Sequence, residues 1–200
     1  MKKMLALMIP AVLCLSLVAC GGGDSSVAGT DSSVAQDSSV AQTSSAVEDS
    51  SAQEADYLNY TFEFDLPAGF SEPAELPEGA DGFWQAEDGS NINYVAVESD
   101  GSLASEVPGD AMKSTMEQGY SAQLGEEVSL ENFAFESTDI DGCPAYKMSY
   151  DLTINGVTIS QTVIGVNGDK AYTYSFTDMT GEWGDAFAAA IDSMTAVPVA

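Results

Sequence analysis

Histidine and arginine are absent from this 200-residue sequence, and lysine occurs only five times. Without histidine, the chain lacks the general base that Ser-His and Cys-His catalysis requires. Without clustered lysine and arginine, it lacks the cationic surface that binds phosphates and nucleic acids. We therefore expect no Ser-His or Cys-His catalytic pair and no nucleic-acid partner.

Cysteine is also scarce, and its three positions do not predict a disulfide bond. Cys14 lies within an apolar N-terminal run and Cys20 ends that run, which leaves Cys143 alone in the rest of the chain. Paired cysteine and histidine ligands for zinc are missing as well. The stability of the protein must therefore come from an ordinary hydrophobic core.

The N-terminus has the pattern of a secretory signal peptide. Two lysines precede an almost uninterrupted apolar run over residues 4–18, and this run is shorter than the about 20 residues that span a membrane comfortably. Residues 17–20, Leu-Val-Ala-Cys, resemble the lipobox of bacterial lipoproteins. The resemblance implies a signal peptide at 1–19, cleavage before Cys20, and diacylglycerol with fatty acyl chains such as palmitate on the thiol. Two or more acyl chains hold a protein stably on a bilayer.

A polar, repetitive segment follows this cysteine. Residues 20–55 contain no aromatic side chain and repeat the sequence DSSVAQ with drift. Such a composition buries too little apolar surface to offset the entropy of ordering, so we expect a disordered tether. As a flexible coil it has a typical end-to-end distance of roughly 30 Å. Lipid anchor and tether together predict a protein on the extracytoplasmic face of a bacterial cell membrane.

The remaining residues, 56–200, are long enough to form a single globular domain. Apolar alternation and turn signals predict an antiparallel sheet of about six to seven strands. The clearest turn signal is Asn155-Gly156, because both positions of a tight hairpin turn need positive φ. The predicted strands cover residues 60–66, 82–88, 91–99, 128–138, 145–154, 157–166 and 170–176.

Two amphipathic helices are predicted among these strands. In the first, apolar residues recur every four positions after a capping residue, Asp110, and Gly125 ends the pattern. The second follows Thr180 and extends to Met194. Because two amphipathic helices must bury their apolar stripes on the sheet, we predict an α+β layered domain.

The order of these elements resembles the Mog1/PsbP-like fold. The matching features are an opening Y-x-F-x-F-x-L-P-x-G-F segment, a hairpin, a helix, a long meander with NG and NGDKAY turns, and a final helix containing Trp and Phe. The resemblance covers roughly residues 57–197. It implies a binding or assembly module, because members of this fold act mainly in that way. It supplies no catalytic motif, and a fold alone does not name a function.

Acidic residues dominate the charge of the mature chain. Once the predicted signal peptide is removed, three lysines face 32 Asp and Glu residues, a formal net charge of −29. A well-solvated acidic surface explains this charge. A cationic partner or a divalent metal ion is the sharper alternative.

Two turns crowd carboxylates around a glycine and are candidate calcium sites. The TDIDG turn contains Asp139 and Asp141, and the AEDGSN turn contains Glu87 and Asp88. Neither has the D-x-[DN]-x-[DN]-G spacing with a distant glutamate that makes a calcium loop specific. Ordinary acidic turns are the preferred interpretation, so calcium stays an alternative and no other cofactor is expected.

We therefore predict a non-enzymatic, lipid-anchored module that binds a protein or a small ligand outside the cytoplasm. Two alternatives remain open. One is a calcium-dependent envelope component that uses the acidic turns, and the other is a small hydrolase with a carboxylate pair about 5 Å or about 6.5–9.5 Å apart. Aromatic residues on the sheet are further candidates to line a pocket, and the sequence identifies no packing partner for Trp84, Tyr94 and Trp183.

Overall fold

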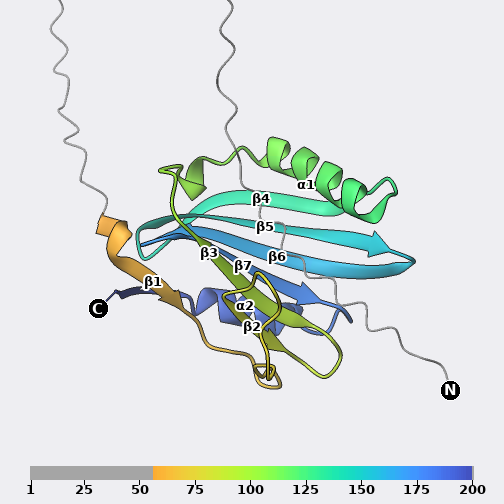
Figure 1. Ribbon diagram of the computed structural model, residues 1–200, viewed down its shortest axis with the longest axis horizontal. Helices are drawn as coiled ribbons and strands as arrows, with labels where there is room; N and C mark the ends of the chain where they lie inside the picture. Colours follow the sequence, from red (N-terminus) through yellow and green to blue (C-terminus); the bar gives the residue numbers. More distant parts are fainter. Residues whose placement is uncertain (1–55, 200) are drawn as a thin grey trace, which may run out of the picture. The chain divides into compact units, whose positions relative to one another are not determined.

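The computed structural model of the protein describes residues 56–199 (Figure 1). The predicted signal peptide at 1–19, Cys20 and the predicted tether up to residue 55 lie outside these residues. In chain order, with η for a short 3-10 helix, the described elements are η1 (Asp56–Asn59), β1 (Tyr60–Glu63), β2 (Gly82–Gln85), β3 (Asn91–Val97), η2 (Ala104–Glu106), α1 (Gly109–Leu124), β4 (Leu130–Ile140), β5 (Cys143–Ile154), β6 (Val157–Asn167), β7 (Ala171–Asp178), α2 (Gly184–Asp192) and β8 (Thr195–Pro198).

Six of these strands form one antiparallel sheet in the order β2-β3-β7-β6-β5-β4. Strands β4 to β7 are neighbours in sequence order, so this part of the sheet is the predicted meander of hairpins. β3 pairs with β7 from much further along the chain, with Tyr94 opposite Tyr174. β1 and β8 pair with each other in a separate two-stranded sheet. The predicted α+β class, with two helices and an antiparallel sheet, is confirmed.

Tight turns of the meander use left-handed backbone positions. Asn155 and Gly156 join β5 to β6 with φ of 52° and 79°, the geometry that an Asn-Gly pair predicts. Asp141 and Gly142 join β4 to β5 with φ of 51° and 83°. The Asp-Gly pair of the TDIDG turn is therefore used as hairpin turn chemistry.

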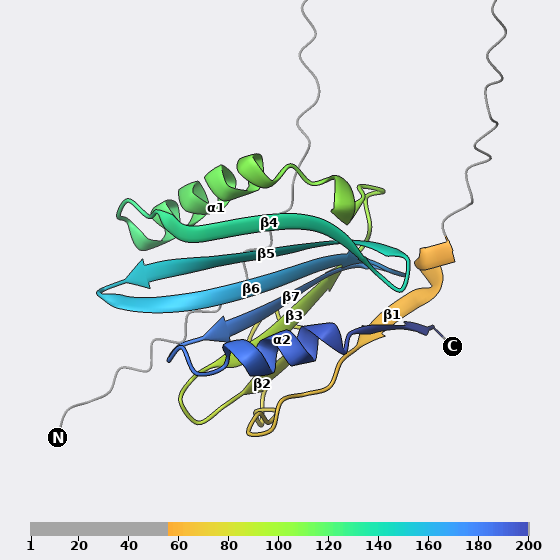
Figure 2. The same cartoon turned by 180° about the vertical axis from the view of Figure 1, so that it is seen from behind.

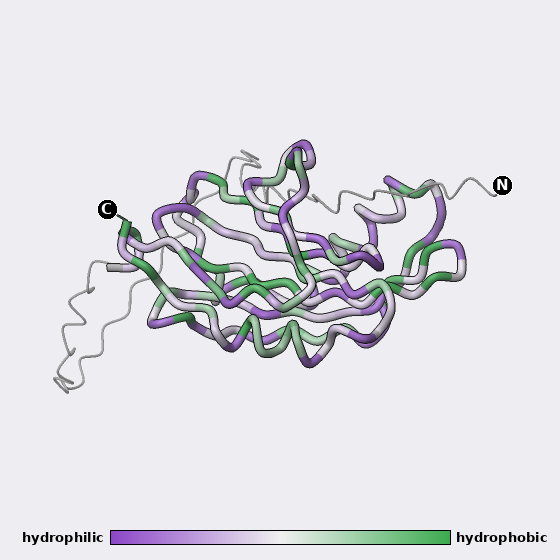
Figure 3. The backbone as a smooth tube through the Cα atoms, turned by 90° about the horizontal axis from the view of Figure 1, so that it is seen from below, coloured by the Kyte–Doolittle hydropathy of each residue, from purple (hydrophilic) through white to green (hydrophobic). Residues whose placement is uncertain are grey.

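The two helices cover opposite faces of the six-stranded sheet (Figure 2). Hydrophobic and hydrophilic residues alternate along the strands (Figure 3), because successive side chains of a strand point to opposite faces. On one face, Phe176 of β7 packs against Phe187 of α2 with ring centroids 5.5 Å apart. On the other, the hydroxyl of Tyr120 in α1 lies 2.8 Å from that of Tyr150 in β5. The sheet is the middle of three layers.

The larger part of the core lies between the sheet and α2, and it is built from aromatic rings. Tyr94 of β3 stacks on Tyr174 of β7 with centroids 5.1 Å apart. Gly82 of β2 makes room for this stack, because a Cβ at that position would lie only 2.7 Å from Cδ1 of Tyr94. Phe62 of β1 closes the layer edge-on against Tyr172, 5.4 Å away. β1 therefore contributes to the core without joining the main sheet.

Polar groups connect α1 to the opposite face of the sheet. The side-chain oxygen of Gln161 accepts hydrogen bonds from the hydroxyls of Tyr120, at 3.2 Å, and of Tyr150. Its amide nitrogen donates to the hydroxyl of Thr177 at 2.9 Å. Burial raises the pKa of both tyrosines. All four side chains are buried, so their mutual hydrogen bonds remove the cost of burying them unpaired.

The segment from η2 to α1 runs along the outer edge of β4, the last strand of the sheet. The N–H of Leu130 donates to the Glu117 carboxylate at 2.9 Å, and the hydroxyl of Ser137 donates to the carbonyl of Ser105 at 2.6 Å. Gly109 lies against the ring of Phe135, where a Cβ would come within 2.8 Å of Cγ. These contacts cover an edge that would otherwise offer unpaired backbone groups to other chains.

The first predicted strand is shorter than the sequence pattern indicates. It ends at Glu63 and not at Leu66, because β8 supplies only four pairing partners. Beyond that point the N–H of Asp65 donates to the hydroxyl of Ser193 at 2.8 Å. Phe64, beyond the end of the strand, still packs against Phe176 of the sheet. This contact explains why the apolar alternation in the sequence continues past Glu63.

Both predicted helices are present, with different ends. Asp110 lies inside the first turn of α1 and does not cap it, since the helix begins one residue earlier and Pro108 is at the cap. Gly125 ends the helix in the left-handed conformation, as predicted, with φ of 72°. α2 ends two residues before Met194, which is buried beyond the helix. None of the helices within residues 56–199 is long and apolar enough to cross a membrane.

Candidate functional site

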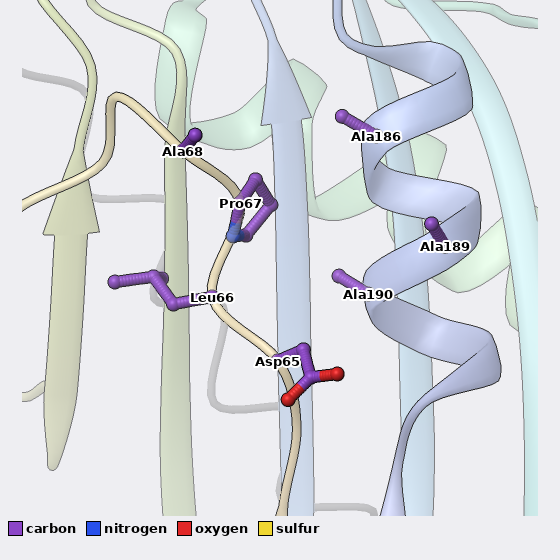
Figure 4. A pocket seen from close by; sticks show the side chains of 7 residues that line it. All are labelled: Asp65, Leu66, Pro67, Ala68, Ala186, Ala189 and Ala190. Carbon is purple, nitrogen blue, oxygen red and sulfur yellow. The ribbon is translucent and has the colours of Figure 1, made fainter.

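A groove of about 350 Å³ lies between α2 and the chain that follows β1 (Figure 4). This volume is at the lower end of the range for small-molecule sites. Small apolar residues dominate the walls. The lining residues are Asp65, Leu66, Pro67, Ala68, Ala186, Ala189 and Ala190.

Contacts at both ends of the groove hold the loop beside the helix. At the C-terminal end of α2, the Asp65 N–H bonds the hydroxyl of Ser193, which in turn donates to the carbonyl of Ala190 at 2.6 Å. At the N-terminal end, Phe70 packs edge-on against Trp183 with centroids 4.7 Å apart. Between these two contacts, loop and helix stay apart and leave the groove open.

The helix side of the groove is positioned by one buried carboxylate. Asp178, at the end of β7, accepts hydrogen bonds from the N–H groups of Thr180, Gly181 and Trp183 at 3.0, 2.7 and 2.9 Å. These bonds fix the turn between β7 and α2, up to Trp183, the residue directly before the helix. Phe187 then fixes the rotation of the helix, because its ring is buried in the core.

On the helix side, the groove is lined by three alanines, whose small side chains leave the space unfilled. Ala186, Ala189 and Ala190 lie at i, i+3 and i+4 and therefore share one face of α2. In Figure 4, Ala186 and Ala190 point from the helix toward the loop. Larger side chains at these positions would fill the space.

One charge lines the groove. Asp65 is exposed, and its carboxylate is directed toward α2 in Figure 4. The lysines of the described residues lie in other elements. Lys113 pairs with Glu117 within α1 at 3.7 Å, and Lys147 lies 4.0 Å from a glutamate of β4. Asp65 thus presents a negative charge beside apolar walls.

The aromatic residues that the sequence left without partners are mostly packed into the core. Trp84 stacks on Tyr94 with centroids 6.2 Å apart, and Phe64 meets Trp84 edge-on at 5.5 Å. Burial, together with the nearby charge of Asp81, raises the pKa of Tyr94. The rings of Phe64, Trp84 and Tyr94 remain partly exposed at the β2 side of the sheet. Phe64 directly precedes Asp65, which lines the groove.

Trp183 is fixed by Asp88, one of the predicted calcium ligands. Its indole N–H donates to Oδ2 of Asp88 at 2.7 Å, and the hydroxyl of Thr180 donates to the same oxygen at 3.2 Å. Oδ1 accepts the N–H of Ser90 at 2.9 Å. Burial acts to raise the pKa of Asp88, but these hydrogen bonds outweigh it and hold the pKa below its usual value. Asp88 therefore joins the β2–β3 turn to the start of α2.

The four candidate calcium ligands are not brought together. Asp139 and Asp141 lie at the β4–β5 turn, at the end of the sheet where β3 finishes. Glu87 and Asp88 lie at the β2–β3 turn, at the end where β3 starts. The two predicted turns are thus at opposite ends of the sheet.

The carboxylates of the β4–β5 turn bond backbone groups. Asp139 accepts the N–H of Gly142 at 3.0 Å, and Asp141 accepts the N–H of Ala196 at 2.9 Å. The second bond links the turn to β8. Within the described part of the chain, no group of three or more His, Cys, Asp and Glu side chains could hold a metal ion.

Cys143 is a free thiol in the core, although it falls between the predicted strands at 128–138 and 145–154, where the sequence predicts a loop. It is the first residue of β5, is 1% exposed and has no disulfide partner. Burial raises the pKa of the thiol, and the nearby charges of Asp141 and Asp139 raise it further. A buried, protonated thiol packs as a small apolar group and is a poor nucleophile.

Comparison with known proteins identifies the fold. No known protein family matches the sequence, and no curated protein matches it. Among solved structures, the chain is similar to cyanobacterial PsbP (CyanoP) from Synechocystis sp. PCC 6803, with a TM-score of 0.51 and 16% identity over 68% of this chain and 86% of that chain. LpqN of Mycobacterium tuberculosis, described as involved in cell envelope biogenesis, aligns with a TM-score of 0.39 and 14% identity over 70% of this chain and 84% of that one. The first similarity confirms the predicted PsbP-like fold.

The groove residues were missed in the sequence. The i, i+3, i+4 spacing of Ala186, Ala189 and Ala190 is a readable signal for a small-residue helix face. No pattern connects that face to Asp65, more than a hundred residues earlier. Only the packing of the chain after β1 onto α2 brings the two sides together.

Proposed function

We propose that the protein is an extracytoplasmic lipoprotein that acts as a non-enzymatic binding or assembly module. The lipobox-like sequence ending at Cys20 supports the lipid anchor, and the repetitive polar segment up to residue 55 supports a tether between anchor and domain. The PsbP-like fold is compatible with a binding role, although a fold by itself does not assign one.

The groove between α2 and the chain after β1 is the observation that carries the binding role. It is held open by contacts at both ends, so a ligand meets a preformed surface and little ordering cost. Its lining offers apolar packing and one carboxylate, Asp65. Such a lining provides recognition, whereas acyl transfer or hydrolysis would need a nucleophile with a base beside it.

The anchor is tested on the full-length protein expressed in a bacterial host. We expect mass spectrometry of the mature N-terminus to find a diacylated or triacylated Cys20 and no residues 1–19. A Cys20→Ser variant should be released from membrane fractions. A free thiol at Cys20, or an intact leader, would contradict this part of the proposal.

The binding role is tested by photo-crosslinking from the groove in intact cells. A photoreactive amino acid replaces Ala68 at the groove wall, and a matched variant carries it at Ala122 on the exposed surface of α1. We expect a discrete crosslinked species from the groove position, absent from the α1 position. The species should also disappear when Ala189→Leu fills the groove. Equal crosslinking from both positions would contradict a role for the groove.

A further inference from the structure

We propose that the groove binds a lysine side chain of a partner protein. The methylene stem lies along the walls formed by Pro67, Ala186 and Ala189, and the ammonium group pairs with Asp65. This inference rests on the proposed binding function and specifies the chemistry of the partner.

The shape and lining of the groove suit a lysine stem. Lysine carries four methylene groups that pack along apolar surface while the charged end stays near water. The alanine face of α2 and the loop residues Pro67 and Ala68 supply apolar walls. Asp65 is exposed, and a purely apolar ligand would displace part of the water around its carboxylate without supplying a counter-charge, which costs free energy.

The few lysines of the domain lie away from Asp65, so a cation that pairs with it has to come from another molecule. Residues 56–199 contain 26 Asp and Glu residues and three lysines, a formal charge of −23. Lys113 and Lys147 are paired in α1 and between β4 and β5, away from the groove. Lys170 lies in the β6–β7 turn. The charge therefore favours a basic partner, and it also opposes a second copy of this acidic chain at the same place.

The lining favours lysine over arginine. Arginine gains most where its flat guanidinium stacks on an aromatic face or meets a carboxylate with two parallel hydrogen bonds. No aromatic ring lines the groove, whose described walls are alanine, proline, leucine and one carboxylate. A compact ammonium on a flexible stem needs neither an aromatic surface nor a fixed approach to Asp65.

The test is an NMR titration of the full mature chain with labelled alanine methyl groups. The probes are blocked single residues: N-acetyl-lysine N-methylamide, and the norleucine, arginine and Nε-acetyl-lysine analogues. We expect the lysine probe to shift the methyl signals of Ala186 and Ala189. Its dissociation constant should be about fivefold lower than that of the norleucine probe, the effect of one partly exposed ion pair. Raised ionic strength should abolish this difference.

Variants separate the contribution of the charge from that of the walls. Asp65→Asn should raise the dissociation constant for the lysine probe to the value for norleucine. Ala189→Leu should abolish binding of both probes. Asp192→Asn, a matched loss of an exposed carboxylate on α2 outside the groove lining, should change neither constant. Dispersed methyl spectra verify that each variant is folded.

Several results would overturn the inference. They are equal binding of the lysine and norleucine probes, stronger binding of the arginine probe, or retention of lysine affinity in Asp65→Asn. Binding of the free diamine cadaverine without binding of the blocked lysine would overturn a protein partner as the source. If the probes fail while the groove crosslink persists in cells, the lysine assignment is wrong and the binding function stands. If the crosslink also fails, both are wrong.

Discussion

Gly165 provides a sharp test of side-chain packing on the β5–β6 part of the sheet. It lies in β6 directly opposite Tyr146 of β5, and the end of the tyrosine side chain lies over it. A Cβ at position 165 would come within 2.7 Å of the Tyr146 hydroxyl oxygen and closer still to two ring carbons. Carbon atoms in contact normally lie about 3.5–4.0 Å apart. The ring would therefore have to move by about 1 Å or more to accommodate an alanine.

That movement is opposed by the neighbouring strand. The Tyr146 ring stacks on Phe135 of β4 with centroids 5.4 Å apart. Overpacking of a core costs about 1–3 kcal/mol. The chain entropy that glycine loses on folding offsets about 0.5–1 kcal/mol. We expect Gly165→Ala to lower the free energy of unfolding by about 1–2 kcal/mol in urea titrations followed by tryptophan fluorescence.

A double-mutant cycle with Tyr146→Leu isolates the steric cause. Leucine ends at its δ carbons and lacks the outer ring atoms that meet position 165. Gly165→Ala should then be neutral or stabilising by about 0.5 kcal/mol in the Tyr146→Leu background. Gly156→Ala is the control, because its cost comes from φ of 79° in a turn with no atom within 4 Å of a Cβ, and Tyr146→Leu should not change it. An equal cost of Gly165→Ala in both backgrounds would refute the reasoning.

Three further predictions concern the start of α2, alkaline pH and the free thiol. Asp178→Ala removes three backbone hydrogen bonds from the turn that leads into α2 and should lower the free energy of unfolding by about 2 kcal/mol in thermal melts. Asp185→Ala, at an exposed site within α2, should change it by less than about 0.5 kcal/mol. Burial and the hydrogen bond to Asp169 raise the pKa of Tyr172 to about 12. Neutral Tyr172 thus stabilises the fold below pH 10, and this contribution should be lost between about pH 10 and 12. Tyr172→Phe should flatten that part of the stability profile, and an unchanged slope would contradict it. Cys143 should react with Ellman's reagent at least a hundredfold more slowly in the native protein than in urea, because it is buried; similar rates would show that this end of β5 opens freely.

Local sequence signals predicted the meander and its turns well. Asn155-Gly156 needs no distant information, because the two residues favour the same tight turn wherever strands flank them. Gly125 ended α1 for an equally local reason, since only a residue that tolerates positive φ closes a helix in this way. Strands joined by such turns are neighbours by construction, so the order β4 to β7 followed from the sequence.

Pairings between distant segments could not be predicted in the same way. Nothing in Tyr60 or Phe62 specifies that β1 pairs with β8 and leaves the main sheet. The placement of α1 and α2 on opposite faces depends on the parity of residues along β5 and β7, which a shift of one residue would reverse. Asp141 shows the same limit for the candidate sites, because its bond to Ala196 needs β8 beside the β4–β5 turn.

The site was less predictable than the fold. Asp88 stands in an acidic turn that favours a calcium interpretation, but its oxygens bond Trp183, Thr180 and Ser90. These partners come from two separate parts of the chain. The groove depends in the same way on contacts such as Asp65 with Ser193.

β1, the first strand of the domain, pairs only with β8, the last strand. A chain that is synthesised or exported from its N-terminus delivers Phe62 early, but the backbone groups beside it find their partners only when residues 195–198 arrive. Partial chains that lack residues 195–198 therefore leave β1 without its pairing strand, and the domain is complete only when both segments are present. For the exported lipoprotein proposed above, this order would leave the domain incomplete until its last strand has crossed the membrane.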